Sequence, residues 1–106
     1  MSSLIVTMKT FGNIIRTKRE EKGMLLRELA ARMNIDTALL SKIERGERRL
    51  KKNQINKISK VLHLEKEELK AYWMADKIFQ IIKDEKDPLR AISVAEEQIK
   101  YITKEK

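Results

Sequence analysis

Cysteine is absent from the 106 residues of this chain, so neither a disulfide nor a thiolate metal site can form. The absence suits a reducing compartment, and we expect a cytoplasmic protein. The single histidine, His63, is expected at the end of a helix, because a metal site needs several ligands. We therefore expect neither a metal nor any other cofactor.

Long apolar runs and catalytic residue sets are also missing. The run Leu4-Ile5-Val6 is too short for a signal peptide, and nothing approaches the ~20 apolar residues of a membrane span. There is no Gly-rich phosphate loop and no Ser/His/Asp set. Adjacent carboxylates such as Glu67 and Glu68 point to different faces of a helix. The sequence thus predicts a protein that is not an enzyme and does not enter a membrane.

Positive charge is abundant, and it is concentrated in the first part of the chain. The formal net charge is +8. Residues 1–63 hold fifteen Lys and Arg against six Asp and Glu, whereas residues 64–106 hold nine against ten. A basic front half joined to a nearly neutral rear half predicts a module that binds a polyanion, followed by a module that binds protein.

Hydrophobic periodicity predicts an all-α fold in three parts. These are an N-terminal tail over residues 1–10, with Met8 as an alternative start to Met1, a helical bundle over residues 11–64, and a helical segment over residues 65–106. The expected helices span residues 11–22, 26–33, 37–45, 53–62 and 65–86, with a last helix from residue 88 onward.

The few glycines and the single proline mark the ends of these helices. Gly23 and Gly46 each end a helix, and Pro88 suits the first position of the last one. The expected N-caps are Thr10 and Asp36. Asn34 is suited to the positive φ of a tight turn between the second and third helices.

The second and third helices carry a recognisable motif. The third ends in Ser41-Lys42-Ile43-Glu44-Arg45-Gly46, and the pair Leu29-Ala30 precedes it in the second. With these motifs the chain resembles the helix-turn-helix domains of lambda-repressor/Cro and XRE-type regulators, including the controller proteins of restriction–modification systems. The resemblance implies a lambda-repressor-like bundle that binds double-stranded DNA through the major groove.

The resemblance also assigns site residues by position. Contacts to base edges are implied for Thr37, Ala38, Ser41 and Lys42 of the third helix and for Arg48 of the following loop. Among these, Lys42 is suited to guanine O6 and N7, and Ala38 to a thymine methyl group. Contacts to phosphate, which give affinity rather than sequence reading, are implied for Arg27, Arg45, Arg49, Lys51 and Lys52.

Glu44 and the start of the second helix need separate interpretation. A carboxylate facing DNA would be repelled, so Glu44 is expected to support a neighbouring arginine, with Arg16 as the partner. The family often has Ser or Thr followed by Gln where this chain has Leu25 and Leu26. The side-chain cap is therefore missing, and we expect Leu26 to pack inward or against the tail while Arg27 takes the phosphate.

The rear segment has apolar residues around more than half of its first helix and along one stripe of its second. We predict that it forms a homodimer, because helix-turn-helix proteins bind paired half-sites as two-fold dimers. The expected interface residues are Leu69, Tyr72, Trp73, Phe79 and Ile82. The alternatives are helices that fold back on their own bundle, and a ligand pocket, for which convergent polar groups are lacking.

Together these features predict a sequence-specific transcription regulator that acts as a homodimer on an inverted-repeat operator. The alternative is a protein-interaction adaptor or an antitoxin-like protein that binds its partner through the C-terminal helices. In that case its affinity for DNA is non-specific, so a preference among DNA sequences distinguishes the two functions.

Overall fold

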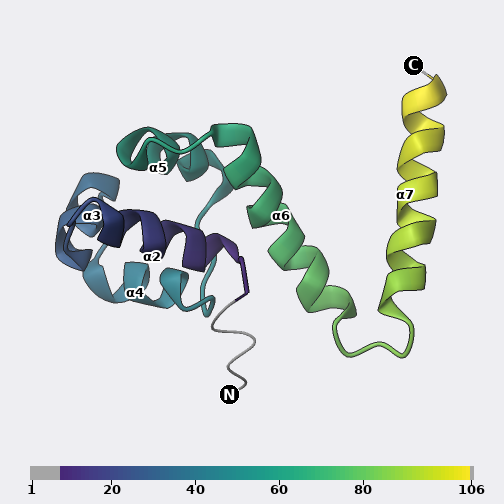
Figure 1. Cartoon of the computed structure of the whole chain (residues 1–106), viewed down its shortest axis with the longest axis horizontal. Helices are drawn as coiled ribbons and strands as arrows, with labels where there is room; N and C mark the ends of the chain where they lie inside the picture. Colours follow the sequence, from purple (N-terminus) through teal and green to yellow (C-terminus); the bar gives the residue numbers. More distant parts are fainter. Residues whose placement is uncertain (1–7, 106) are drawn as a thin grey trace. The chain divides into compact units, whose positions relative to one another are not determined.

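The computed structural model describes residues 8–105, and every regular element in this part of the chain is helical (Figure 1). The all-α prediction is confirmed, and the expected helix bounds agree to within about two residues, except that the helix expected over residues 65–86 ends at Ile82. Residues 1–7 of the expected N-terminal tail lie outside the described residues, and Met8 as an alternative start stays a prediction. The elements are α2 (Phe11–Glu21), α3 (Leu26–Met33), α4 (Thr37–Glu44), the 3-10 turn η1 (Lys52–Gln54), α5 (Ile55–Leu62), α6 (Lys66–Ile82) and α7 (Pro88–Glu105).

The predicted caps and turns are present. The Thr10 side chain accepts a hydrogen bond from the backbone N–H of Asn13, at 3.1 Å, and begins α2. Asp36 accepts from the N–H of Leu39, at 3.0 Å, and begins α4. Asn34 has a φ of 57°, which reverses the chain between α3 and α4. These local interactions define where each helix of the motif begins and ends.

The chain divides into two compact units, the first extending to Asp76 and the second beginning at Lys77. In the first unit α2 and α3 each contact both α4 and α5, and a single apolar core lies between them. The core side chains are Phe11, Ile15, Leu29, Ala30, Met33, Leu40, Ile43, Leu50, Ile55, Ile58, Leu62 and Leu69.

Two members of this core differ from the sequence-based expectation. Leu50 was not assigned to the core, and it lies in the middle of the basic loop, residues 45–52, yet only 2% of it is exposed. Leu69 belongs to α6 and is equally buried. Because Leu69 packs in the core, the first unit continues well past the expected boundary at residue 64.

The burial of Leu69 also corrects the predicted dimer interface. Leu69 lies inside its own unit and offers no surface to a second chain. Tyr72 and Trp73 are partly buried against the same core, because α6 packs on it through this stretch. Phe79, 39% exposed, and Ile82 lie farther along α6 in the second unit, where their place in an interface stays a prediction.

The second unit consists of the end of α6 and of α7, and much of its apolar surface is exposed. Ile81 is 67% exposed, Leu89 76% and Ile99 63%. Apolar groups left in water to this extent are unusual on a small helical unit unless another surface covers them. No helix in the described part of the chain is long and apolar enough to cross a membrane.

Candidate nucleic-acid interface

α4 presents small and polar side chains on its outer face. Thr37, Ala38 and Lys42 are exposed, whereas Leu40 and Ile43 on the opposite side are buried. The fourth expected base contact, Ser41, is partly buried. The outer face is therefore narrow and free of bulky groups, as a helix that enters the major groove must be.

The end of α4 is fixed to α2 by an ion pair. The Arg19 Nε donates to Glu44 Oε2 at 2.7 Å, and Arg19 Nη2 donates to Glu44 Oε1 at 3.0 Å. Both side chains are largely buried, with 11% and 5% exposed. The hydrogen bond that Arg19 donates to Glu44 raises the pKa of Arg19 above its usual value. α4 is therefore held by two charge-assisted hydrogen bonds at the turn that precedes the basic loop.

The identity of this arginine corrects the sequence-based expectation, which named Arg16. Arg16 pairs instead with Glu20, four residues along the same helix, and both side chains are more than half exposed. Arg19 lies four residues after the buried Ile15 and therefore on the face of α2 that is directed toward the core. The helical spacing of Phe11, Ile15 and position 19 is the signal that identifies the correct arginine.

Gly12 allows α2 and α4 to approach closely. A Cβ atom at this position would lie 2.5 Å from the backbone oxygen of Glu44 and 2.6 Å from that of Ile43. Only a glycine fits there, because both neighbours are backbone atoms that cannot turn aside. This role of Gly12 was not predicted from the sequence.

The basic loop between α4 and η1 has a defined conformation. The buried side chain of Leu50 anchors its centre, and the side chain of Trp73 donates from Nε1 to the Leu50 carbonyl oxygen at 2.7 Å. All five expected loop contacts are exposed, namely Arg45, Arg48, Arg49, Lys51 and Lys52. The loop therefore presents a cluster of cations beside the end of α4.

Two of these arginines are engaged within the chain. Arg45 donates to both carboxylate oxygens of Glu47, at 2.7 and 3.3 Å, and to Ser41 Oγ at 2.5 Å. Arg49 lies over the ring of Trp73, with 4.1 Å between Cζ and the ring centroid. The contacts of Glu47 and Trp73 with these two arginines were not predicted, because each pair of side chains meets only when the loop is folded.

The start of α3 departs from the family pattern as expected. Leu25 provides no side-chain cap, but its backbone N–H donates to Glu28 Oε1 at 2.7 Å, so that Glu28 satisfies one free donor. Leu26 packs against the core, which confirms the inward orientation. Arg27 is exposed at the same end, and its contact with phosphate stays a prediction.

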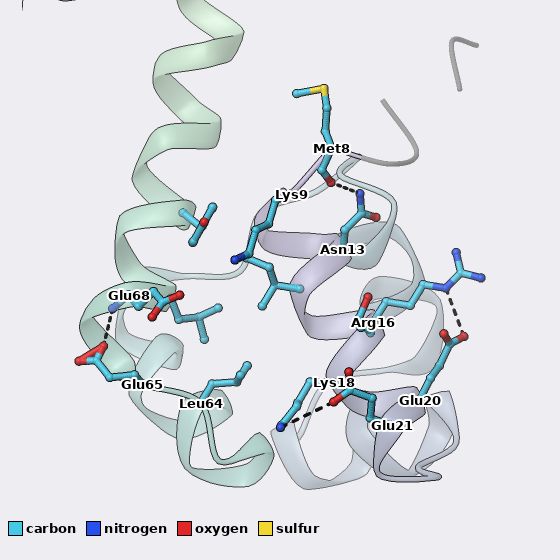
Figure 2. A pocket seen from close by; sticks show the side chains of 14 residues that line it. Met8, Lys9, Asn13, Arg16, Lys18, Glu20, Glu21, Leu64, Glu65 and Glu68 are labelled. Atoms are coloured by element: carbon cyan, nitrogen blue, oxygen red, sulfur yellow. Dashed lines mark hydrogen bonds and ion pairs between the residues drawn. The ribbon is translucent and has the colours of Figure 1, made fainter. Parts of the chain in front are cut away.

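A groove of about 830 Å³ lies between α2 and the start of α6 in the first unit (Figure 2). Ile14, Leu64 and Leu69 give it an apolar floor. Charged side chains at its edge pair with neighbours on their own helix, as in the Lys18–Glu21 contact at 3.7 Å. Polar groups therefore do not converge on a common point, as they would in a small-molecule site. Among the described residues no three His, Asp or Glu side chains are placed to hold a metal ion.

Comparison with known proteins identifies the family. The helix-turn-helix family profile matches residues 15–69, more than half of the chain. This chain belongs to the XRE-type helix-turn-helix family of DNA-binding regulators. The matched stretch extends from α2 to Leu69 on α6 and contains α4 and the whole basic loop.

Solved structures of two regulators are similar to this chain. The clp gene regulator ClgR from Corynebacterium glutamicum is 25% identical, with a TM-score of 0.52 over 61% of this chain and 84% of that one. The restriction–modification controller protein C.AhdI from Aeromonas hydrophila is 30% identical, with a TM-score of 0.51 over 63% and 93%. A second ClgR structure, 22% identical, covers 80% and 88% with a TM-score of 0.53 and shares the fold. No curated protein sequence matches the chain.

Proposed function

We propose that this regulator binds a specific operator sequence by inserting α4 into the major groove. The observation that carries the proposal is the exposed face of Thr37, Ala38 and Lys42 on a helix held by the Arg19–Glu44 pair. Lys42 reads a guanine edge, and Thr37 and Ser41 bond to neighbouring bases. A base-reading helix needs this rigidity, since small displacements break hydrogen bonds to base edges.

The basic loop and Arg27 supply the contacts to phosphate in this proposal. Their cations are exposed next to the reading helix and neutralise backbone charge without distinguishing sequences. Each phosphate neutralised contributes about −0.9 to the slope of log affinity against log salt concentration. The affinity for DNA is therefore expected to fall steeply as salt is raised.

We further propose that the regulator is a cytoplasmic homodimer that binds an inverted repeat. The second unit supports this, because many of its apolar side chains are exposed in the single chain, with Phe79, Ile81, Leu89 and Ile99 among them. A two-fold dimer sets the two reading helices about one helical turn of DNA apart, ~34 Å. The similarity to a restriction–modification controller and a clp gene regulator is consistent with control of a small set of genes.

The test is selection of bound fragments from the source genome with the purified protein, followed by footprinting. An enriched inverted repeat with half-sites about one turn apart supports a dimeric operator-binding protein. Flat enrichment, with binding that depends on salt but not on sequence, would favour the alternative function. That alternative is an adaptor or antitoxin-like protein that docks a partner on the exposed apolar face of the second unit.

A further inference from the structure

Trp73 of α6 is in direct contact with the basic loop. Its Nε1 donates to the carbonyl oxygen of Leu50, and the side chain of Leu50 is buried in the core below. The loop backbone is thus fixed at the residue that follows Arg49. Asp76, one turn farther along α6, accepts a hydrogen bond from the Phe11 N–H at 3.1 Å, so this part of α6 also holds the start of α2.

Arg49 contacts the face of the Trp73 ring. Its guanidinium lies over the Trp73 ring at 4.1 Å, and the negative charge of Asp76 acts on it as well. An aromatic ring attracts the guanidinium through its charge and accepts no conventional hydrogen bond from it, so the N–H donors in the guanidinium plane are not used up by this contact. None of these donors has an acceptor among the described residues. The edge of Arg49 is therefore available for a bidentate contact with a phosphate group.

Arg45 in the same loop is arranged in the opposite way. Its N–H groups are already engaged by Glu47 and Ser41, so a phosphate contact requires these bonds to break first. Arg49 needs no such exchange, and its contact with the Trp73 ring favours one position of the side chain before DNA is bound. The two arginines carry the same charge but differ in their N–H donors, which are engaged in Arg45 and available to an anion in Arg49.

We infer that the indole face of Trp73 positions Arg49 as a preformed phosphate clamp, so that α6 sets part of the affinity for DNA. The inference rests on the proposed function and assigns to Trp73 a role that lies outside the helix-turn-helix motif. Trp73 is a positioning residue, since it acts on DNA only through Arg49. The clamp serves every DNA sequence alike, because it contacts the backbone.

The test is a double-mutant cycle with a 30-bp duplex of mixed sequence as the probe. The affinities of wild type, Arg49→Ala, Trp73→Leu and the double variant are measured over a range of salt concentrations. Arg49→Ala and Trp73→Leu are each expected to reduce the salt slope by about 0.9 and to weaken binding about eightfold at 0.1 M salt. In the Arg49→Ala background Trp73→Leu is expected to change the affinity less than about twofold.

Trp73→Phe distinguishes positioning from a general loss of structure. This variant keeps an aromatic face beneath Arg49 but loses the hydrogen bond to Leu50, so the salt slope of the wild type is expected to remain. Circular dichroism confirms that each variant is folded at the temperature of the binding assay. The inference is overturned if Trp73→Leu weakens Arg49→Ala as much as it weakens wild type, or if Trp73→Phe behaves like Trp73→Leu. Wild-type protein that does not bind the duplex overturns the proposed function as well.

Discussion

Arg19 and Glu44 form a buried, bidentate ion pair that joins the last turn of α2 to the last turn of α4. The pair connects α4, the helix that we propose reads DNA, to the core of the first unit. Arg19 also donates to the backbone oxygen of Met24 at 2.9 Å, ahead of α3. One guanidinium therefore holds both helices of the motif to α2.

Removal of the carboxylate should destabilise the fold. Glu44→Ala leaves the Arg19 charge in a poorly solvated position without its partner, and we expect a loss of about 3 kcal/mol in the free energy of unfolding. Denaturation in urea, followed by circular dichroism, measures this value. The control is Glu21→Ala, which breaks the Lys18–Glu21 pair on the surface of the same helix and should cost at most about 0.5 kcal/mol. Equal losses in the two variants would contradict the role of the buried pair.

Gly12→Ala tests the close approach of α2 to α4. The added Cβ would meet the backbone oxygens of Ile43 and Glu44 at 2.6 and 2.5 Å, so the helices must separate. We expect a loss of about 1–3 kcal/mol in stability and a weaker affinity for DNA, because the end of α4 is displaced. The matched control is Thr17→Ala, at an exposed position of the same helix, for which a change within about 0.5 kcal/mol is expected. A Gly12→Ala protein as stable as wild type would refute the packing argument.

Lys42→Ala tests base reading. The loss of one bidentate contact to guanine should cost about 1–3 kcal/mol on the operator and relax the preference at one base position. Binding to the operator and to a scrambled duplex is measured at one salt concentration. Lys57→Ala removes the same charge from an exposed site on α5. It should leave the preference for the operator over the scrambled duplex unchanged. If Lys42→Ala weakens both duplexes equally, Lys42 contacts phosphate rather than a base.

Glu47→Gln should tighten the binding of DNA. The neutral side chain releases Arg45 for a phosphate contact, so we expect a salt slope steeper by up to about 0.9 and a several-fold higher affinity. Glu67→Gln on α6 makes the same change in net charge at an exposed site and serves as the control. If both variants bind equally, net charge rather than release of Arg45 explains the gain.

The effect of Glu47→Gln also has an expected pH dependence. The hydrogen bond from Arg45 holds the pKa of Glu47 below its usual value of 4.5. A carboxylate with a lowered pKa is ionised and keeps its ion pair at every pH above its usual pKa. It loses the pair only as the pH falls through the lowered pKa. The difference between Glu47→Gln and wild type should therefore be constant between about pH 6 and pH 8, as titrations at several pH values can verify.

The sequence predicted most of the helix-turn-helix motif but few of the tertiary contacts that hold it in place. Caps such as Thr10 and Asp36 depend on residues within one turn, and for this reason their roles could be inferred from the sequence and were confirmed. The partners of Trp73 and Glu44 lie 23 and 25 residues away, and such pairs are determined only by tertiary packing. Leu50 was missed because a single apolar residue among charged neighbours has no periodicity to identify it.

The last prediction concerns the apolar stripe of α7. Ile99 is 63% exposed and contributes nothing to the core of its own chain, so Ile99→Glu should leave the helix content and the stability of the first unit unchanged. In a homodimer the same charge would be buried against apolar groups. We expect dimer formation to weaken by on the order of a hundredfold, about 3 kcal/mol. Sedimentation equilibrium measures the dissociation constant directly.

Ser93→Glu is the matched control, because it places the same charge on α7 but on a different face of the helix from Ile99. It should dimerise like wild type. On an operator with two half-sites, Ile99→Glu should bind with the affinity of a single half-site, because the DNA-binding units of two chains are no longer joined in one dimer. Wild-type protein that sediments as a monomer at ~100 μM, or an Ile99→Glu variant that dimerises normally, would instead indicate that this face does not form a homodimer and binds a different protein. The exposed stripe would then favour the adaptor function over the dimeric operator-binding protein.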